Sequence, residues 1–406
     1  MKNNYFLIFL SLILLGCYSQ QPQTVRTVKT GAEVLLDEHL TELAGKRIGL
    51  VMNPTSRVDG VHMVDTLLSL GVNVTALFAA EHGFRGEAGA GEQIRDGVDQ
   101  ETGLPVFSLY GSTKKPTLEM LQGVDLLLFD LPDMGVRFYT YNSTMGLVME
   151  SIAENDKELW ILDRPNPLGG NYVAGWILRE EYKSFVGSYP MPIAYGMTMG
   201  EIARMAVGEQ WLDLPAEPNY KVIKTSGWKR DMRWPDTGLP WFAPSPNLPA
   251  FEHAFVYPGT VIFEGTNLSE GRGTADPFLT IGAPGFGFKP EELEELEVKH
   301  SVGLDPVTFT PQSIPGKAIH PKHEGQECTG IRISFQGNYD KTDPVRLGLD
   351  LLKFAQAHTP NFEMKAFANK LYGIDLKSII ENKEEIPSWQ AEVEAFKEQR
   401  TPYLLY

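Results

Sequence analysis

Short apolar runs that end abruptly in polar residues recur through the first half of the chain. Polar residues, glycine or proline follow each of these runs, which cover residues 48–52, 74–80, 124–129 and 159–162. Stretches with helical character lie between them, such as residues 63–70 and Tyr141–Glu154. Strands buried on both faces are continuously apolar, and their alternation with helices is typical of a parallel sheet. We therefore predict a Rossmann-like, doubly wound α/β domain with a mostly parallel sheet.

Further elements complete this domain and begin a second one. Residues 191–195 predict another strand, and the spacing of Thr198 and Glu201 predicts a capping box at the start of a helix. The Pro-rich residues 240–249 cannot form a helix or a central strand. We expect them to cross between domains or to line a cleft with Trp241 and Phe242.

The second half mixes strands with amphipathic helices. Residues 331–335 alternate like a half-buried strand, apolar residues recur at helical spacing over 347–355, and residues 389–400 predict a late helix. We assign residues 33–249 to the Rossmann-like N-terminal domain. Residues 250–406 are assigned to a smaller α+β C-terminal domain, with a cleft between the two.

The first residues resemble a bacterial lipoprotein signal. Lys2 precedes an apolar stretch over residues 5–15, which is too short to span a membrane as a mature helix. It ends in Leu14-Leu15-Gly16-Cys17. We predict a signal peptide over residues 1–17, a lipid on Cys17 and a tether over 18–32, which places the protein in the bacterial cell envelope. The alternative is a plain secretory signal with an incidental cysteine.

Composition and charge narrow the class of ligand. The net charge is −16 and the pI about 5.0, which disfavours nucleic acid and anionic membrane surfaces as partners. No G-x-G-x-x-G motif follows the first strand, and the glycine-rich residues 86–92 carry acids where a phosphate loop carries Lys and Ser or Thr. We therefore expect no nicotinamide or flavin. Mature chains would keep only Cys328, which excludes an internal disulfide and a cysteine metal site.

The strongest chemical signal is Glu81-His82, which follows the run at residues 74–80 and precedes a glycine turn. A carboxylate beside an imidazole at a strand end is suited to acid–base chemistry. Ligands bind outside the carboxyl ends of strands in such sheets, so we expect the polar residues at the other strand ends to converge there. These candidates for substrate binding are Asn53, Arg85, Asp130, Arg137, Tyr139, Asp163, Arg164 and Asn166. Arg137 and Arg164 could instead lock a neighbouring aspartate.

A second polar cluster occupies one glycine-rich loop, residues 264–274, and comprises Glu264, Asn267, Glu270 and Arg272. Glycosidases commonly place two carboxylates across the scissile bond, and one from each domain would suit a cleft at the junction. The alternative is a surface loop with internal salt bridges. His320 and His323 have H-x-x-H spacing, but a surface loop is the better interpretation, and we predict no metal.

Five motifs resemble the exo-β-N-acetylmuramidase family (NamZ-type glycoside hydrolases). They occupy residues 53–55, 80–86, 129–141, 162–167 and 264–274, and the likeness covers nearly all of the chain after the tether. The resemblance implies release of terminal N-acetylmuramic acid from the non-reducing ends of peptidoglycan fragments, without a cofactor. It also implies a cleft between a Rossmann-like domain and a smaller C-terminal domain, with Glu81 as the leading catalytic residue.

Roles follow as hypotheses from this resemblance. Glu81 would be the general acid, and His82 would orient it or touch the sugar. Glu264 or Glu270 would be the second carboxylate, either as a base or as electrostatic support. The lactyl carboxylate of the sugar needs a local cation, for which Arg85, Arg137, Arg164 and Arg272 are the candidates. The rival functions are a non-catalytic lipoprotein that captures muropeptides for uptake and a metal-dependent hydrolase of another bond. Retention or inversion of configuration stays open.

Overall fold

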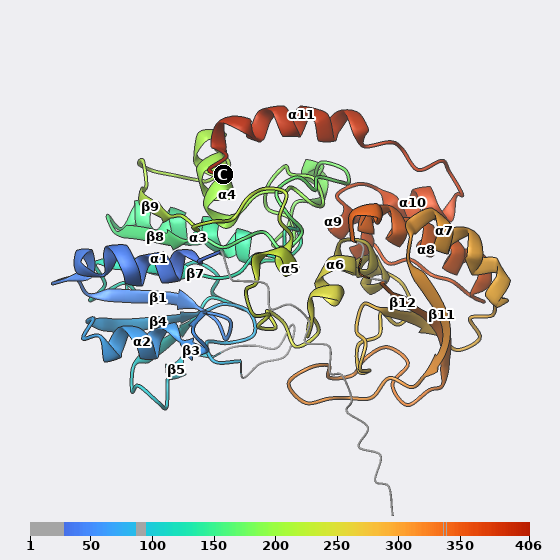
Figure 1. Ribbon diagram of the computed structural model, residues 1–406, viewed down its shortest axis with the longest axis horizontal. Coiled ribbons are helices and arrows are strands. Elements are labelled where there is room, and N and C mark those ends of the chain that lie inside the picture. The colour runs from blue at the N-terminus through green and yellow to red at the C-terminus, as the bar shows by residue number, and fades with distance from the viewer. Residues whose placement is uncertain (1–27, 87–94, 336, 338) are drawn as a thin grey trace, which may run out of the picture.

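The computed structural model describes residues 28–86, 95–335, 337 and 339–406 (Figure 1). A seven-stranded sheet organises the first half. Its strands, in spatial order, are β5 (Gly97–Val98), β6 (Pro105–Ser108), β4 (Val74–Ala79), β1 (Ile48–Met52), β7 (Leu126–Asp130), β8 (Glu158–Leu162) and β9 (Asn219–Ile223). Only β5 pairs antiparallel among these. The chain winds from β1 to one side and then to the other, which confirms the predicted doubly wound α/β fold.

Both faces of this large sheet are covered, as its apolar strands require. Along β1, Val51 contributes to one hydrophobic core, whereas Leu50 and Met52 contribute to the core on the opposite face. The helices around the sheet are α1 (Gly31–Val34), α2 (Met63–Ser69), α3 (Tyr141–Glu154), α4 (Met199–Gly208) and α5 (Trp234–Thr237). The hairpin of β2 (Arg57–Val58) and β3 (Val61–His62) follows β1. We call this assembly the large-sheet part.

A small antiparallel sheet organises the second half, here called the small-sheet part. Its strands, in spatial order, are β10 (Thr280–Ala283), β12 (Cys328–Ser334) and β11 (Gly303–Phe309). The α-helices that follow the large-sheet part are α6 (Phe251–Thr260), α7 (Glu294–His300), α8 (Pro344–His358), α9 (Phe367–Tyr372), α10 (Leu376–Glu381) and α11 (Gln390–Arg400). Helix η4 (Val261–Gly265), a 3-10 turn, continues α6 and brings the loop 264–274 toward the large-sheet part.

The chain returns to the large-sheet part at its end. Helix α11 crosses above both parts in Figure 1 and ends beside α4. Arg400 donates to the carbonyl of Tyr195 at 2.8 Å, and the Tyr406 hydroxyl donates to Asp163 at 2.8 Å. Trp176 packs edge-on against Trp389 with ring centroids 4.8 Å apart. These contacts tie the two parts together; the predicted domain boundary at 249/250 stays a prediction.

Two local predictions need correction. Residues 191–195 form no strand, because they are irregular and make only isolated bridges, at Ala194 with Val136 and Ala174. The predicted tether extends too far, since Val28 and Ala32 are wholly buried and the Gly31 amide donates to the Asp163 carbonyl at 2.7 Å. A side chain at Gly31 would meet that backbone at 2.4 Å, so glycine is required there. The remaining tether and Cys17 lie outside the described residues.

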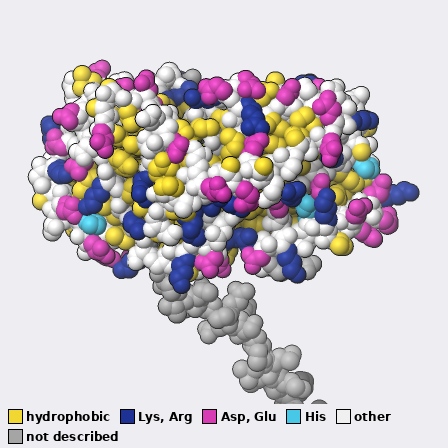
Figure 2. All heavy atoms as spheres, turned by 90° about the horizontal axis from the view of Figure 1, so that it is seen from above, with side chains coloured by type: hydrophobic (Ala, Val, Ile, Leu, Met, Phe, Trp, Pro, Cys, Tyr) yellow, Lys and Arg dark blue, Asp and Glu magenta, His cyan; other side chains and the backbone are white. Residues whose placement is uncertain are grey.

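Other local predictions hold. Thr198 and Glu201 form the expected capping box at the start of α4. The predicted helix over residues 389–400 is α11, and residues 331–335 fall largely within β12. Figure 2 shows Lys and Arg side chains interspersed with Asp and Glu over the face seen from above. The acidic net charge therefore does not form a single-sign surface on that face.

Candidate active site

Glu81 stands just beyond the carboxyl end of β4 and is held from α3. The Thr140 hydroxyl donates to Glu81 Oε2 at 3.2 Å, and the Tyr141 hydroxyl donates to the Glu81 backbone carbonyl at 3.0 Å. Thr140 is the N-cap residue of α3, so the start of that helix fixes both contacts. The carboxylate is half-buried. This is the geometry expected of a positioned acid–base group.

Tyrosines surround this carboxylate. Burial and the negative charge of Glu81, which also accepts a hydrogen bond from the phenol, raise the pKa of Tyr110. Burial, followed by the charges of Glu264 and Glu81, raises the pKa of Tyr257 well above its usual value. The charges of both carboxylates, one from each part of the molecule, thus act on the pKa of Tyr257. Both phenols stay protonated and can donate hydrogen bonds.

A compact charge cluster lies opposite Glu81 on the loop 264–274. Arg272 pairs with Glu264 at 2.6 Å and with Glu270 at 3.4 Å, and Lys322 pairs with Glu270 at 2.9 Å. Glu270 is 4 % exposed. Burial opposes its ionisation, but the charges of Lys322 and Arg272 outweigh burial and lower its pKa. Glu270 is therefore an anion at neutral pH.

These groups line one cavity of about 410 Å³ between the two parts of the molecule. Glu81, Tyr110 and Thr140 contribute from the large-sheet part. The small-sheet part contributes Tyr257 together with the charge cluster, and the loop 317–322 closes one side. Four of the predicted site residues share this cavity, namely Glu81, Glu264, Glu270 and Arg272.

Most of the predicted substrate-binding residues at the other strand ends form internal bonds. Asn53, wholly buried, donates from Nδ2 to the Tyr141 hydroxyl at 2.9 Å. Arg164 forms a bidentate pair with Asp130, at 2.6 and 2.8 Å, and Asp130 has no exposed surface. Of the two options for Arg164, locking an aspartate is what the structure shows.

Asp163 and Asn166 bind their own surroundings in the same way. Asp163 accepts from the Thr198 hydroxyl at 2.7 Å and from the Gly200 amide at 2.9 Å. Asn166 donates from Nδ2 to the Met197 carbonyl at 2.9 Å. These contacts hold the start of α4 against the sheet. Neither side chain lines the cavity of Glu81.

The remaining predicted residues also lie outside the lining of that cavity. Arg85 pairs with Asp65, Asp99 and Glu101 at 2.6 to 3.1 Å. Arg137 is wholly buried and donates to backbone carbonyls, among them that of Trp176 at 2.9 Å. Neither guanidinium lines this cavity, and the predicted role of the two arginines in substrate binding stays a prediction.

Tyr139, Asn267 and His82 have local partners or surroundings of their own. Tyr139 donates to the Pro244 carbonyl at 2.9 Å, and Asn267 donates to the Asn361 carbonyl at 2.8 Å. His82 is buried, with 5 % exposure and a left-handed φ of 76°. Its predicted role in orienting Glu81 stays a prediction.

Four residues of the site escape the sequence analysis, namely Tyr110, Thr140, Tyr257 and Lys322. Thr140 lay within the motif at residues 129–141, and a threonine before a helix is a recognisable cap signal. Lys322 lay between the two histidines of the loop expected at the surface. His320 of that loop does line the cavity, and His323 contacts the Asn267 carbonyl at 2.7 Å. No cluster of three or more His, Cys, Asp or Glu suited to a metal occurs among the described residues.

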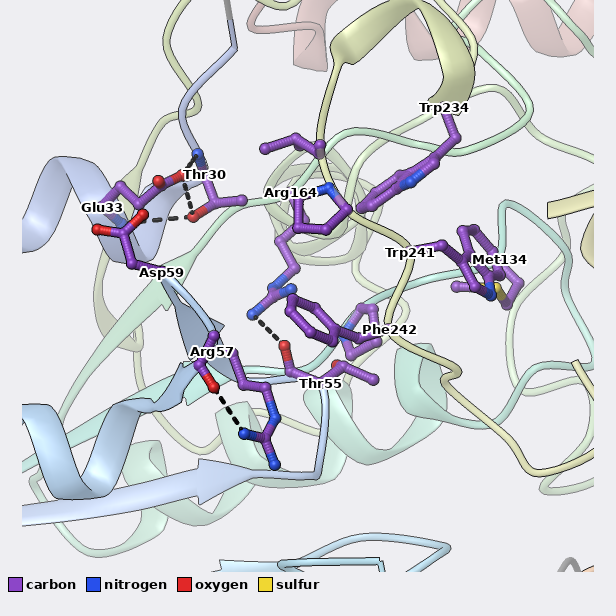
Figure 3. Close-up of a pocket in the computed structure, with 14 residues that line it drawn as sticks. Thr30, Glu33, Thr55, Arg57, Asp59, Met134, Arg164, Trp234, Trp241 and Phe242 are labelled. Carbon is purple, nitrogen blue, oxygen red and sulfur yellow. Dashed lines mark hydrogen bonds between the residues drawn. The ribbon is translucent and has the colours of Figure 1, made fainter. Parts of the chain in front are cut away.

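A second cavity of about 290 Å³ opens at the ends of β1, β7 and β8 (Figure 3). Its wall includes Trp234, Trp241 and Phe242, with Arg57 lying over the Phe242 ring. The Pro-rich segment thus lines a cavity, as one of the two expectations had it, but not the one that holds Glu81. The Arg164 guanidinium that borders this cavity donates to the Thr55 carbonyl at 3.2 Å (Figure 3).

Known proteins resemble this chain over nearly its whole length. Sequence profiles of exo-beta-N-acetylmuramidase NamZ match residues 48–252 with the N-terminal part and residues 255–406 with the C-terminal part. A protein of Bacillus subtilis (strain 168) named peptidoglycan beta-N-acetylmuramidase NamZ is 43 % identical over 389 residues, which cover 93 % of this chain and 91 % of that protein.

Two crystal structures of DUF1343 family proteins from Bacteroides fragilis NCTC 9343 share the fold. One has a TM-score of 0.81 and 33 % identity, covering 94 % of this chain and 100 % of that one. The other has a TM-score of 0.77 and 36 % identity, covering 93 % and 99 %. The α/β architecture described above is therefore shared with solved proteins.

Proposed function

The chain belongs to the exo-β-N-acetylmuramidase NamZ family, and we propose that it is a glycoside hydrolase acting on peptidoglycan fragments. It releases terminal β-linked N-acetylmuramic acid from their non-reducing ends, as a step in cell-wall turnover. The observation that carries the proposal is that Glu81 and the charge cluster of Glu264, Glu270 and Arg272 line the same cavity.

Glu81 serves as the general acid. Its carboxyl group is positioned by Thr140 and borders open cavity, so it can protonate the glycosidic oxygen as the bond breaks. Protonation of the leaving group by a positioned carboxylic acid is common to retaining and inverting glycosidases.

Glu270 serves as the ionised second carboxylate. The cations Arg272 and Lys322 keep it charged, so it can stabilise the positive charge that develops at the anomeric carbon. The anomeric configuration of the first product, followed by proton NMR, decides whether Glu270 itself attacks this carbon or a water molecule does.

The lactyl carboxylate of N-acetylmuramic acid requires a cation that the cluster does not already use. Arg272 is held by Glu264 and Glu270, and Lys322 by Glu270 and the carbonyls of Phe263 and Leu268. Lys317 is exposed on the loop that closes the cavity, and it forms no ion pair with any other described residue. We assign the lactyl carboxylate to Lys317.

The chain is further proposed to be a lipoprotein of the bacterial cell envelope, anchored through Cys17. The signal-like residues 1–17 support this proposal. No helix in the described residues is long and apolar enough to cross a membrane. Replacement of Cys17 by Ala is expected to move the protein from the membrane fraction to the soluble fraction and to abolish labelling by a radioactive fatty acid. Unchanged membrane association would contradict the anchor.

The activity is tested with the chain from residue 28, an aryl β-N-acetylmuraminide and the matching β-N-acetylglucosaminide, with and without a chelator. We expect cleavage of the muraminide alone, unaffected by the chelator. Muropeptide binding without cleavage would indicate a capture protein instead. Loss of cleavage on chelation would indicate a metal-dependent hydrolase.

A further inference from the structure

Another hollow, distinct from the cavity of Figure 3, adjoins the catalytic cavity. It has a volume of about 250 Å³. We call it the Tyr110 hollow, and it is lined by Arg95, Asp96, Ser108, Tyr110, Gly111, Ser112 and Thr113. Tyr110 also lines the catalytic cavity, so both spaces border this residue.

The lining of the Tyr110 hollow is polar and open. Arg95, Asp96 and Ser112 are exposed, and Thr113 is half-buried. The Asp96 carboxylate accepts from the Ser108 amide at 2.8 Å, which anchors this wall to β6. A Cβ on Gly111 would meet nothing within 4 Å, so the backbone there borders empty space. Hydroxyl, carboxylate and guanidinium groups around a space of this size suit a polar ring such as an amino sugar.

Glu81 lines the catalytic cavity and is linked to the hollow through Tyr110. The Tyr110 phenol donates a hydrogen bond to the Glu81 carboxylate and borders the hollow at the same time. A general acid must lie within hydrogen-bond reach of the oxygen that it protonates. The glycosidic oxygen therefore lies beside Tyr110, at the junction.

This junction gives the substrate a direction. The ring whose anomeric carbon reacts must lie near the second carboxylate, on the side of Glu264 and Glu270. The rest of the substrate then continues past Tyr110. Phe185 packs near Tyr110, with ring centroids 6.5 Å apart, and lines the catalytic cavity, so an aromatic pair flanks the crossing point.

We propose that the Tyr110 hollow is the leaving-group subsite and binds the N-acetylglucosamine unit that follows the terminal N-acetylmuramic acid. This inference rests on the proposed function. Ser112, Thr113 and Arg95 contact the leaving sugar, and the catalytic cavity holds only the ring that is released. Changes at Ser112, Thr113 and Arg95 thus affect a disaccharide substrate, and they do not affect a substrate whose leaving group is too small to reach the hollow.

The test compares two substrates in one variant. Ser112→Trp fills the hollow, and we expect kcat/KM for the disaccharide N-acetylmuramyl-β-1,4-N-acetylglucosamine to fall at least about 10-fold. The value for N-acetylmuramyl β-fluoride, whose leaving group is a single atom that does not reach the hollow, should stay within about 2-fold. Leu118→Trp places a tryptophan at a residue that is 63 % exposed and lines neither space, so it should change neither value.

Arg95→Ala is a second variant that removes contacts instead of adding bulk, should Ser112→Trp fail to fold. We expect it to lower kcat/KM for the disaccharide alone, by a smaller factor. Equal losses on both substrates, or no loss on the disaccharide, would overturn the leaving-group assignment. A wild-type protein that cleaves neither substrate would overturn the proposed function itself, and with it this subsite.

Discussion

Polar residues leave the carboxyl edge of the large sheet in two groups that are held very differently. At the end of β4, Glu81 faces a cavity, and its carboxylate accepts hydrogen bonds from the Thr140 hydroxyl and the Tyr110 phenol. At the ends of β7 and β8, Asp130 and Asp163 are wholly buried and bonded to Arg164, Thr198 and the backbone. The first arrangement leaves a carboxylate available to a ligand, whereas the second builds the wall behind it.

The difference teaches that a polar residue at a strand end is not by itself part of the chemistry. Asp130 and Arg164 would each be costly to bury alone, and only their bidentate pairing makes burial tolerable. Glu270 shows a third condition, since it is buried and paired but still borders the cavity. We therefore expect substitutions in the two groups to separate activity from stability.

Apart from Glu81→Gln, the largest effect is expected from Glu270→Gln. Removal of the charge should lower kcat by about 10² to 10³, because stabilisation of transition-state charge is lost. Stability should fall as well, since Arg272 and Lys322 lose a buried partner. Steady-state kinetics with the aryl muraminide and thermal unfolding measure the two. Glu291→Gln, an exposed glutamate, is the control, and near-normal kcat in Glu270→Gln would refute the role of this carboxylate.

The next largest effect is a loss of stability on substitution in the buried group at the ends of β7 and β8. Asp130→Asn should destabilise the protein by about 3–5 kcal/mol, because it leaves the Arg164 guanidinium buried without a counter-charge. The folded fraction should keep kcat within about 3-fold, since neither residue lines the cavity of Glu81. Denaturant-induced unfolding measures the loss of stability, and steady-state kinetics below the unfolding transition measure kcat.

An exposed pair supplies the control for that variant. Asp125 forms a similar bidentate pair with Arg47, but the two side chains are 39 % and 49 % exposed, whereas Asp130 has no exposed surface. Asp125→Asn should therefore change stability far less than Asp130→Asn. Equal losses of stability in the two variants, or a large loss of kcat in Asp130→Asn, would contradict the distinction between the buried structural group and the residues of the cavity.

The smallest effect is a shift in pH dependence. The charges of Lys322 and Arg272 hold the pKa of Glu270 below its usual value, so this group stays ionised, and active, to lower pH than a free glutamate would. Lys322→Met removes one cation and should move the acid limb of the kcat profile to higher pH. Lys317→Met removes a cation of the same cavity that does not pair with Glu270 and should leave the limb in place. An unmoved limb in Lys322→Met would exclude Glu270 as the group that titrates there.

Part of this arrangement could be predicted from the sequence. The apolar runs located the parallel strands because such strands are buried on both faces, and the abrupt change at Glu81 marked the site. The prediction of a strand over residues 191–195 is wrong because an apolar run is equally compatible with a buried irregular segment. This segment makes isolated bridges and does not join the sheet. Hydrophobicity reports burial and not hydrogen-bond pairing.

The distinction between wall and site could not be predicted. Asp130 and Arg164 are 34 residues apart, and Arg137 contacts a carbonyl 234 residues away. Such partners are decided by tertiary packing. Tyr110 and Tyr257 are also visible only in three dimensions, because an isolated tyrosine in a sequence is as readily a core residue as a ligand contact.

The most direct test of the central claim measures how Glu81→Gln depends on the leaving group. If Glu81 protonates the glycosidic oxygen, kcat/KM for the disaccharide should fall by about 10² to 10⁴. The value for a 2,4-dinitrophenyl β-N-acetylmuraminide, whose leaving group needs no proton, should stay within about 10-fold of wild type. Equal losses on both substrates would contradict the assignment of Glu81 as the general acid.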